Sequence, residues 1–192
     1  MQADFAVELG ADDEALEFPW STASDHLRYL DLKNHPDLLP QIEEVARLPE
    51  LGEFLVSVNS PSGVLETAKC DAWGTSEIHP EEEIFGAARK FGGYVDLLFS
   101  DPLQRYSLPE HEQFARRITE LLKRVPEIPA SAEFLLRRCY YHQENSGETR
   151  EGFYITFYLF GYGDEEKQAR QRWAIALRLV ENAIRQLSAS RP

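Results

Sequence analysis

Cysteine is scarce in this chain of 192 residues, which holds only Cys70 and Cys139. Two cysteines cannot form the disulfide framework of a small secreted domain. They also lack the close spacing of zinc ligands, and the five histidines show none of the spacings that zinc sites use. The sequence therefore predicts a reduced, cytoplasmic protein with no metal and no other cofactor.

Long apolar runs are absent, since no stretch approaches the roughly 18 consecutive apolar residues of a membrane span. The first five residues contain neither the basic nor the apolar region of a signal peptide, so none is expected. Basic residues are few: 20 Lys and Arg stand against 33 Asp and Glu, for a formal net charge of −13. Because this charge repels phosphate, we expect no nucleic-acid partner, and without a spanning segment we expect no membrane association.

The common catalytic motifs are missing as well, among them GxSxG, the P-loop and GxGxxG. Cys139 follows Arg138, whose charge could lower the thiol pKa, but His142 would point to the opposite face of a strand. His79 precedes three glutamates, residues 81–83, which point apart and therefore suit a solvated loop better than a hard-cation site. These absences favour a binding protein over an enzyme.

Hydrophobic residues, which make up 43% of the chain, are sufficient for a core. A chain of this length buries roughly 70% of its unfolded surface, so a single domain over 1–192 is expected. The acidity is concentrated in residues 1–96, with 20 acidic and 6 basic residues, whereas residues 97–192 have 13 and 14. This asymmetry indicates either an acidic surface that keeps the protein soluble or an acidic face that binds a basic partner.

The apolar periodicity divides the chain into four sections. They are an N-terminal extension over 1–35 with short strands at 5–9 and 27–32, a helical segment over 36–63, and two strand–strand–helix units over 64–126 and 130–190. The expected strands of these units cover 64–78, 88–99, 132–143 and 152–162, and the expected helices begin after Ser107 and at 164. Two hairpins each followed by a helix predict an α+β fold: an antiparallel sheet with helices packed on one face. Lys69-Cys70 and Arg138-Cys139 hold similar places in the two units, which suggests a duplication.

Residues 152–162 carry the strongest strand signal, and aromatic side chains occupy both faces of this strand. Alternation places one group toward the helices, Phe153, Ile155, Phe157 and Leu159. The other face holds Tyr154, Thr156, Tyr158, Phe160 and Tyr162. Large exposed aromatic area marks an interface or a ligand surface. The alternative is that the sheet curls, or that the N-terminal segment covers it, so that the tyrosines belong to the core.

Alternation also assigns faces in the neighbouring strands. In 64–78 it places Cys70 and Ala72 toward the helices, and Thr67, Lys69, Asp71 and Trp73 on the other face. In 88–99 the other face holds Tyr94, Asp96 and Leu98. Arg137 and Arg138 are adjacent and must point to opposite faces, which leaves open which of them meets the tyrosines, as an anion-binding arginine or in an ion pair. The candidate ligand- or partner-binding residues are Tyr154, Tyr158, Phe160, Tyr162, Tyr140 and Arg138.

The order of elements over roughly 37–190 resembles the type III secretion chaperones. Those proteins are small, acidic, cytoplasmic and usually dimeric, and they hold an extended segment of a partner. The resemblance implies a homodimer that binds a protein partner, here through the aromatic face. The first 35 residues and the aromatic content depart from that pattern. The alternative is a small-molecule-binding module with a tyrosine-lined pocket, similar to duplicated strand–helix modules of the effector-binding type.

Overall fold

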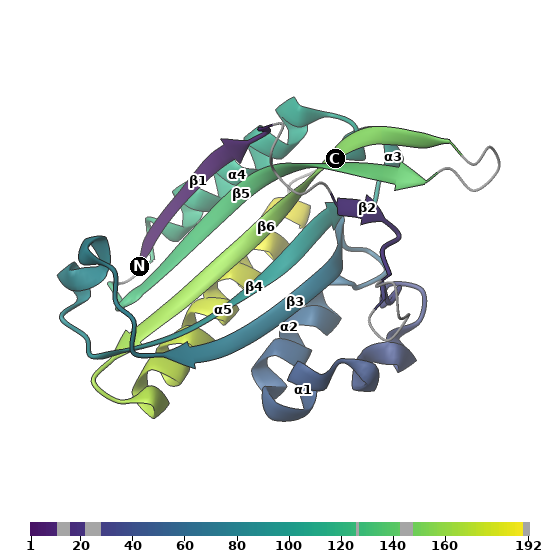
Figure 1. Ribbon diagram of the computed structural model, residues 1–192. Coiled ribbons are helices and arrows are strands. Elements are labelled where there is room, and N and C mark those ends of the chain that lie inside the picture. The colour runs from purple at the N-terminus through teal and green to yellow at the C-terminus, as the bar shows by residue number, and fades with distance from the viewer. Residues whose placement is uncertain (11–15, 22–27, 126, 143–147, 190–192) are drawn as a thin grey trace.

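A twisted six-stranded sheet forms the centre of the molecule (Figure 1). The computed structural model describes residues 1–10, 16–21, 28–125, 127–142 and 148–189, without the side chains of 81, 83 and 84. The strands are β1 (Gln2–Glu8), β2 (Leu16–Phe18), β3 (Leu65–Thr75), β4 (Arg89–Phe99), β5 (Ala130–His142) and β6 (Thr149–Gly163). Their order across the sheet is β1-β5-β6-β4-β3, with β2 also pairing with β5.

The sheet is mixed, and mostly antiparallel. The β3–β4, β4–β6 and β5–β6 pairs are antiparallel, whereas β1 and β2 each run parallel to β5. The α+β class and both predicted hairpins are therefore confirmed, and the wholly antiparallel sheet is corrected to a mixed one. The duplication of the two units stays a prediction.

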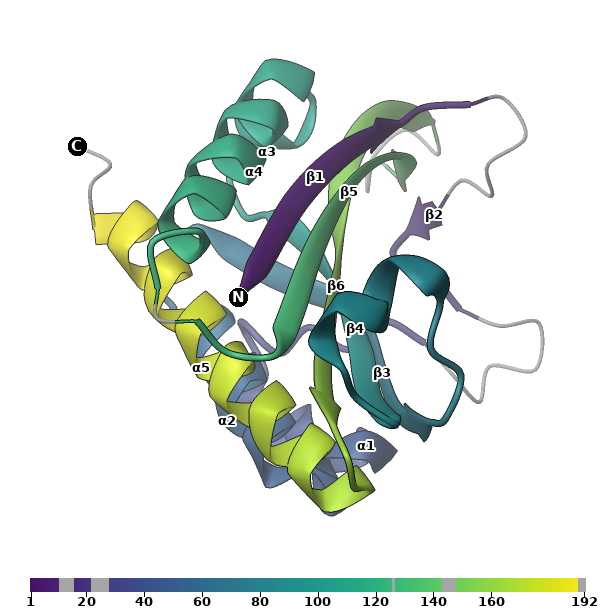
Figure 2. The same ribbon diagram turned by 90° about the vertical axis from the view of Figure 1, so that its left-hand side faces the viewer.

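Helices α2 (Pro49–Val58), α4 (Leu108–Leu122) and α5 (Glu166–Ala189) cover one face of this sheet (Figure 2). Shorter elements are η1 (Pro36–Gln41), α1 (Glu43–Arg47), η2 (Pro80–Phe85) and α3 (Pro102–Arg105). The main core lies between helices and sheet, where Phe157 on β6 packs with Phe54 of α2 and Phe134 of β5. Ser107 caps α4 as predicted, since its hydroxyl accepts a hydrogen bond from the Glu110 amide.

Two predicted details of the N-terminal half are corrected. The strand expected over 27–32 is not formed in its described part; Arg28 makes only an isolated bridge to Ser21. In β3, the pairing register shifts between Thr67 and Cys70, which is a β-bulge. Thr67 consequently lies on the helix side, where Asn59 at the end of α2 bonds its hydroxyl, instead of on the opposite face. Beyond the bulge, Cys70 and Ala72 pack against the main core as expected.

In the described part of the chain, no helix combines the length and the apolar character that crossing a membrane requires.

Candidate functional site

The sheet face opposite the helices, called here the open face, carries aromatic and acidic side chains in rows that follow the strand pairing. In one row Trp73 of β3 lies opposite Gly92 of β4, which lies opposite Phe160 of β6. In the next row the order across the sheet is Asp71, Tyr94, Tyr158 and Glu133. Residues two apart on a strand share a face, so these rows are adjacent on the same surface. The open face is therefore the surface on which β6 presents its second set of aromatic side chains.

One end of the open face is covered by the N-terminal cover, defined as residues 16–21 and 28–33. Leu16 and Phe18 pack with Tyr154 in a second, smaller apolar cluster. Tyr154 is only 5% exposed as a result, and Cys139 in the same cluster is fully buried. The tyrosine at this end of β6 is thus part of a core, as the second of the two sequence interpretations expected.

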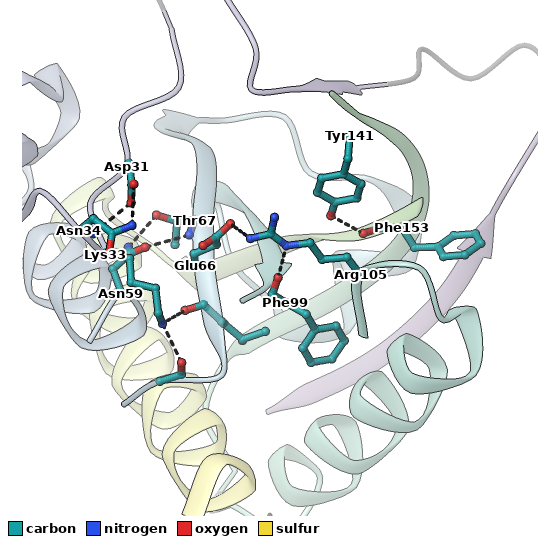
Figure 3. A network of polar contacts seen from close by, with 12 residues as sticks. Asp31, Lys33, Asn34, Asn59, Glu66, Thr67, Phe99, Arg105, Tyr141 and Phe153 are labelled. Atoms are coloured by element: carbon teal, nitrogen blue, oxygen red, sulfur yellow. Dashed lines mark hydrogen bonds and ion pairs between the residues drawn. The ribbon is translucent and has the colours of Figure 1, made fainter. Parts of the chain in front are cut away.

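Polar anchors hold the N-terminal cover to the sheet (Figure 3). The Lys33 ammonium donates to the carbonyl oxygens of Gly63 at 2.7 Å and Leu65 at 3.0 Å. Arg105 makes a 2.6 Å ion pair with Glu66, and its guanidinium lies 5.8 Å from the centre of the Phe18 ring. Burial raises the pKa of Glu66, although Arg105 acts to lower it. These contacts position the cover over one end of the face.

The opposite end is covered by η2. Phe85 stacks on the Tyr162 ring with a centroid distance of 4.1 Å, and the Tyr162 hydroxyl donates to the Glu82 carboxylate at 2.6 Å. Lys90 donates to both oxygens of the same carboxylate, at 2.8 and 3.0 Å. Burial acts to raise the Glu82 pKa, but the hydrogen bonds from Lys90 and Tyr162 outweigh it and lower the pKa. Tyr162 is 1% exposed, so this tyrosine is also buried by the protein's own chain.

Between the N-terminal cover and η2, four aromatic side chains form a closed cycle in which each contacts the next. This group of four side chains is called the aromatic ring. Its members are Trp73, Tyr94, Tyr158 and Phe160. Successive ring centroids are separated by 6.5 Å for Trp73–Tyr94, 5.8 Å for Tyr94–Tyr158, 6.4 Å for Tyr158–Phe160 and 6.5 Å for Phe160–Trp73. All four distances lie in the range of direct aromatic contact. Trp73 is 37% exposed and the other three are half-buried, so solvent reaches these rings.

Gly92 makes the aromatic ring possible. A Cβ atom at this position would lie 2.5 Å from Cδ1 of Phe160, closer than van der Waals contact allows. The absent side chain therefore lets the Phe160 ring lie directly against the β4 backbone. At Gly92, β4 pairs in register with both neighbouring strands, so the glycine does not mark a bulge.

Asp96, which follows Tyr94 on β4, is a buried charged group of the open face. It is only 5% exposed, and its Oδ1 accepts a 2.7 Å hydrogen bond from the Thr156 hydroxyl on β6. Burial raises the pKa of Asp96 to about 6, although Thr156, Lys69 and Arg137 each act to lower it. A buried carboxyl group that titrates near neutral pH on an aromatic surface can bind a polar group of a ligand or exchange a proton with it. The sequence pattern assigned Asp96 to this face and gave no sign of its burial.

Arg137 is the arginine that joins the tyrosines on the open face. It lies opposite Tyr154 in the β5–β6 pairing, and its guanidinium makes a 2.9 Å ion pair with Glu8 of β1. Arg138 and Tyr140 alternate to the other face, where Arg138 lies 3.5 Å from Glu151. The structure thus groups Tyr154, Tyr158, Phe160 and Tyr162 on the open face and places the other two candidates, Arg138 and Tyr140, apart from them.

Two cavities flank the aromatic ring. One, of about 680 Å³, lies at the η2 end; the residues that the open face contributes to it include Asp4, Glu133, Phe160 and Tyr162. The other, of about 770 Å³, follows the outer edge of β3; its lining includes Trp20, Lys69, Asp71 and Tyr94. Both volumes fall within the roughly 300–1,000 Å³ of small-molecule sites.

Burial disfavours the reactive thiolate form of both cysteines. Burial raises the pKa of Cys70 to about 12, and nearby Glu44 and Asp71 raise it further. Burial likewise raises the pKa of Cys139 to about 12, which contradicts the lowering that its neighbour Arg138 suggested. No group of three or more His, Cys, Asp or Glu side chains that could hold a metal ion occurs among the described residues.

Comparison with protein-family models, with curated proteins and with solved structures found no significant match. The likeness to the type III secretion chaperones therefore stays a prediction from element order.

Proposed function

We propose that the protein binds a small organic molecule on the open face, with Asp96 as its polar anchor and the aromatic ring as its apolar wall. The observation that carries this proposal is the burial of the Asp96 carboxyl group, at 5% exposure, among tyrosines. Ligand sites commonly combine apolar and aromatic walls with a few polar groups that fix the ligand's orientation. Two cavities with the volume of small-molecule sites border the aromatic ring, one at Phe160 and one at Tyr94, and Asp96 lies outside the lining of both.

The energetics of Asp96 support a functional role. Burying a carboxylate costs free energy unless it is paired, and the raised pKa is the measure of that cost here. Thr156 supplies one hydrogen bond, while Arg137 is engaged with Glu8. A residue that destabilises the folded protein at neutral pH is typical of a binding or catalytic site, where function offsets the loss. A bound polar group would add to the partial compensation that Thr156, Lys69 and Arg137 supply.

Binding of a protein partner through the same face is less well supported. Tyr154 and Tyr162, two of the expected anchors, are 5% and 1% exposed and lie beneath the covers. The half-buried residues of β6 on the open face are Tyr158 and Phe160, which lie about 7 Å apart along the strand at 3.3 Å per residue. This length suits a small molecule better than a standard protein interface. We retain the homodimer as a separate proposal, because β1 and β3 form the two edges of the sheet and could each pair with a second copy.

Native mass spectrometry tests this proposal. The wild-type protein, incubated with the small-molecule fraction of a cell extract, is expected to gain a mass that is lost on denaturation. Tyr158→Ala should lose that added mass while remaining folded, and Ile175→Ala, at a 50% exposed position on α5, should retain it. An added mass that survives in Tyr158→Ala, or none in the wild type, would contradict binding on the open face. The same spectra give the oligomeric state, since a homodimer has twice the 22.0 kDa mass of the chain.

A further inference from the structure

The charges around the aromatic ring indicate which chemical class of ligand the open face accepts; this inference rests on the function proposed above. Acidic side chains border the aromatic ring in the second row of the open face, where Asp71 lies beside Tyr94 and Glu133 lies beside Tyr158. Asp96 follows Tyr94 on the same face of β4, and Asp4 lies opposite Glu133 on β1. Carboxylates therefore approach the ring from four different strands.

The basic side chains of the open face are engaged elsewhere. Arg137 pairs with Glu8 at 2.9 Å, and Lys90 pairs with Glu82 at 2.8 Å. Lys69 lies 4.7 Å from the centre of the Trp20 ring and acts to lower the pKa of Asp96, and Arg28 lines the cavity at the β3 edge together with it. Within the described part of the face, acidic groups thus outnumber basic ones next to the ring. The raised pKa of Glu133, caused by burial and then by repulsion from Glu8 and Asp4, reflects the same excess of negative charge.

The open face already holds cations of its own against aromatic rings. The Lys90 ammonium lies 4.9 Å from the centre of Phe160, in addition to the Lys69–Trp20 contact. An aromatic face attracts a cation within about 6 Å of its centroid, most strongly when the cation is partly desolvated. Trp73, Tyr94 and Tyr158 present rings that these two lysines do not occupy.

We propose that the ligand is a small organic cation, an alkylated ammonium compound, whose charged group lies over Trp73, Tyr94 and Tyr158 with Asp71 and Asp96 beside it. An alkylated ammonium has an apolar surface that matches the rings and a charge that matches the carboxylates. A carboxylate or phosphate ligand would meet repulsion from the same acidic groups. The two covers limit the accessible length of the face, which favours a free small molecule over a peptide side chain.

Isothermal titration calorimetry compares the affinities for choline and for dimethylbutanol, in which a carbon atom replaces the ammonium nitrogen. The difference between the two affinities measures the contribution of the positive charge. The wild type is expected to bind choline at least about tenfold more tightly, because a cation–π contact at a partly desolvated site reaches this size. Trp73→Leu should lose most of the difference, and Trp73→Phe, which keeps an aromatic ring, should retain part of it. Trp73 is on the edge strand and 37% exposed, so both variants are expected to fold. Val56→Ala, at a 54% exposed position on α2, is the control.

The remaining outcomes separate this inference from the function on which it rests. Equal affinity for choline and dimethylbutanol would refute the proposal that the ligand is a cation, and the proposed small-molecule site would still stand. A molecule that is anionic or uncharged, recovered by native mass spectrometry and lost in Tyr158→Ala, would do the same. Tighter binding of a peptide with a trimethylated lysine than of choline would overturn the free small molecule as the source of the ammonium group.

Discussion

Thr156 Oγ1 donates a 2.7 Å hydrogen bond to Asp96 Oδ1 across the neighbouring strands β6 and β4. The two residues face each other in the pairing register, at the middle of the surface that the helices leave uncovered. This bond fixes the carboxyl group between the aromatic ring and the N-terminal cover. Asp96 is therefore held in a fixed position, which the proposed role of an orienting group requires.

Asp96→Asn should stabilise the protein at neutral pH. The folded-state pKa, about 6, lies above the ordinary value of 3.8, so the folded protein binds this proton more tightly than the unfolded chain. Wild-type stability should therefore fall as the pH rises from 3.8 to about 6, by up to about 3 kcal/mol for this group, and the variant should lack that decrease. Urea unfolding of both proteins between pH 3.5 and 7.5 measures this decrease in the free energy of unfolding. Asp71→Asn, at an exposed position on β3, is the control, and an unchanged pH profile in Asp96→Asn would refute the assigned burial cost.

Arg105→Met should destabilise the protein by about 3 kcal/mol, because it leaves the buried Glu66 carboxylate without its partner. The matched control is Arg178→Met, whose pair with Glu53 is exposed on both sides and should contribute less than about 1 kcal/mol. Thermal or urea unfolding compares the two. Adding Glu66→Gln to Arg105→Met should recover much of the loss, and similar losses for both arginine variants would argue against the anchoring role of this pair.

Gly92→Ala should displace Phe160 and disrupt the aromatic ring, since the new Cβ would lie 2.5 Å from the Phe160 ring. We expect a stability loss of about 1–3 kcal/mol together with a loss of ligand binding. Gly74→Ala is the control: its Cβ would lie 3.2 Å from the Glu166 carboxylate, the end of a flexible side chain. Unfolding and native mass spectrometry on both variants provide the measurement, and full ligand binding by Gly92→Ala would show that the ring is not needed.

Tyr162→Phe should loosen η2, because it removes hydrogen bonds to Glu82 at 2.6 Å and Ser131 at 2.9 Å. A loss of about 1–2 kcal/mol is expected for bonds of this kind. Since the pKa of Glu82 is lowered, the stability from its contacts is present above pH 4.5 and is lost as the pH falls through the folded-state value. The acid-induced loss should be smaller in the variant. Unfolding curves at pH 7 and pH 3.5 test this, with Tyr140→Phe on the opposite face as the control.

The alternation of side chains along the strands predicted most of the sheet from the sequence. In β6, for example, it correctly assigned Phe157 and Tyr158 to opposite faces. What alternation could not decide was the exposure of each face. Tyr162 is covered by η2 and Tyr154 by Leu16 and Phe18, contacts between segments far apart in the chain. A period-two pattern reports on which side a residue lies and contains no information on what a distant loop places over it.

The candidate site was predictable only in part, for related reasons. Adjacent arginines always alternate, so the sequence left open that Arg137 joins the tyrosines and Arg138 does not. The bulge between Thr67 and Cys70 changes the face of Thr67, and no local residue signals it. The parallel pairing of β1 with β5 depends on long-range packing, because two strands separated by most of the chain can pair in either direction.

Three tryptophans allow a direct test of where the ligand binds. Trp73 is on the open face, Trp20 is in the N-terminal cover, and Trp173 is 2% exposed in the core on the helix side. The indole N–H resonances of ¹⁵N-labelled protein should respond to the small-molecule fraction of a cell extract. A shift of the Trp73 resonance with an unchanged Trp173 resonance is the expected result. An unchanged Trp73 resonance would contradict a ligand site on the open face.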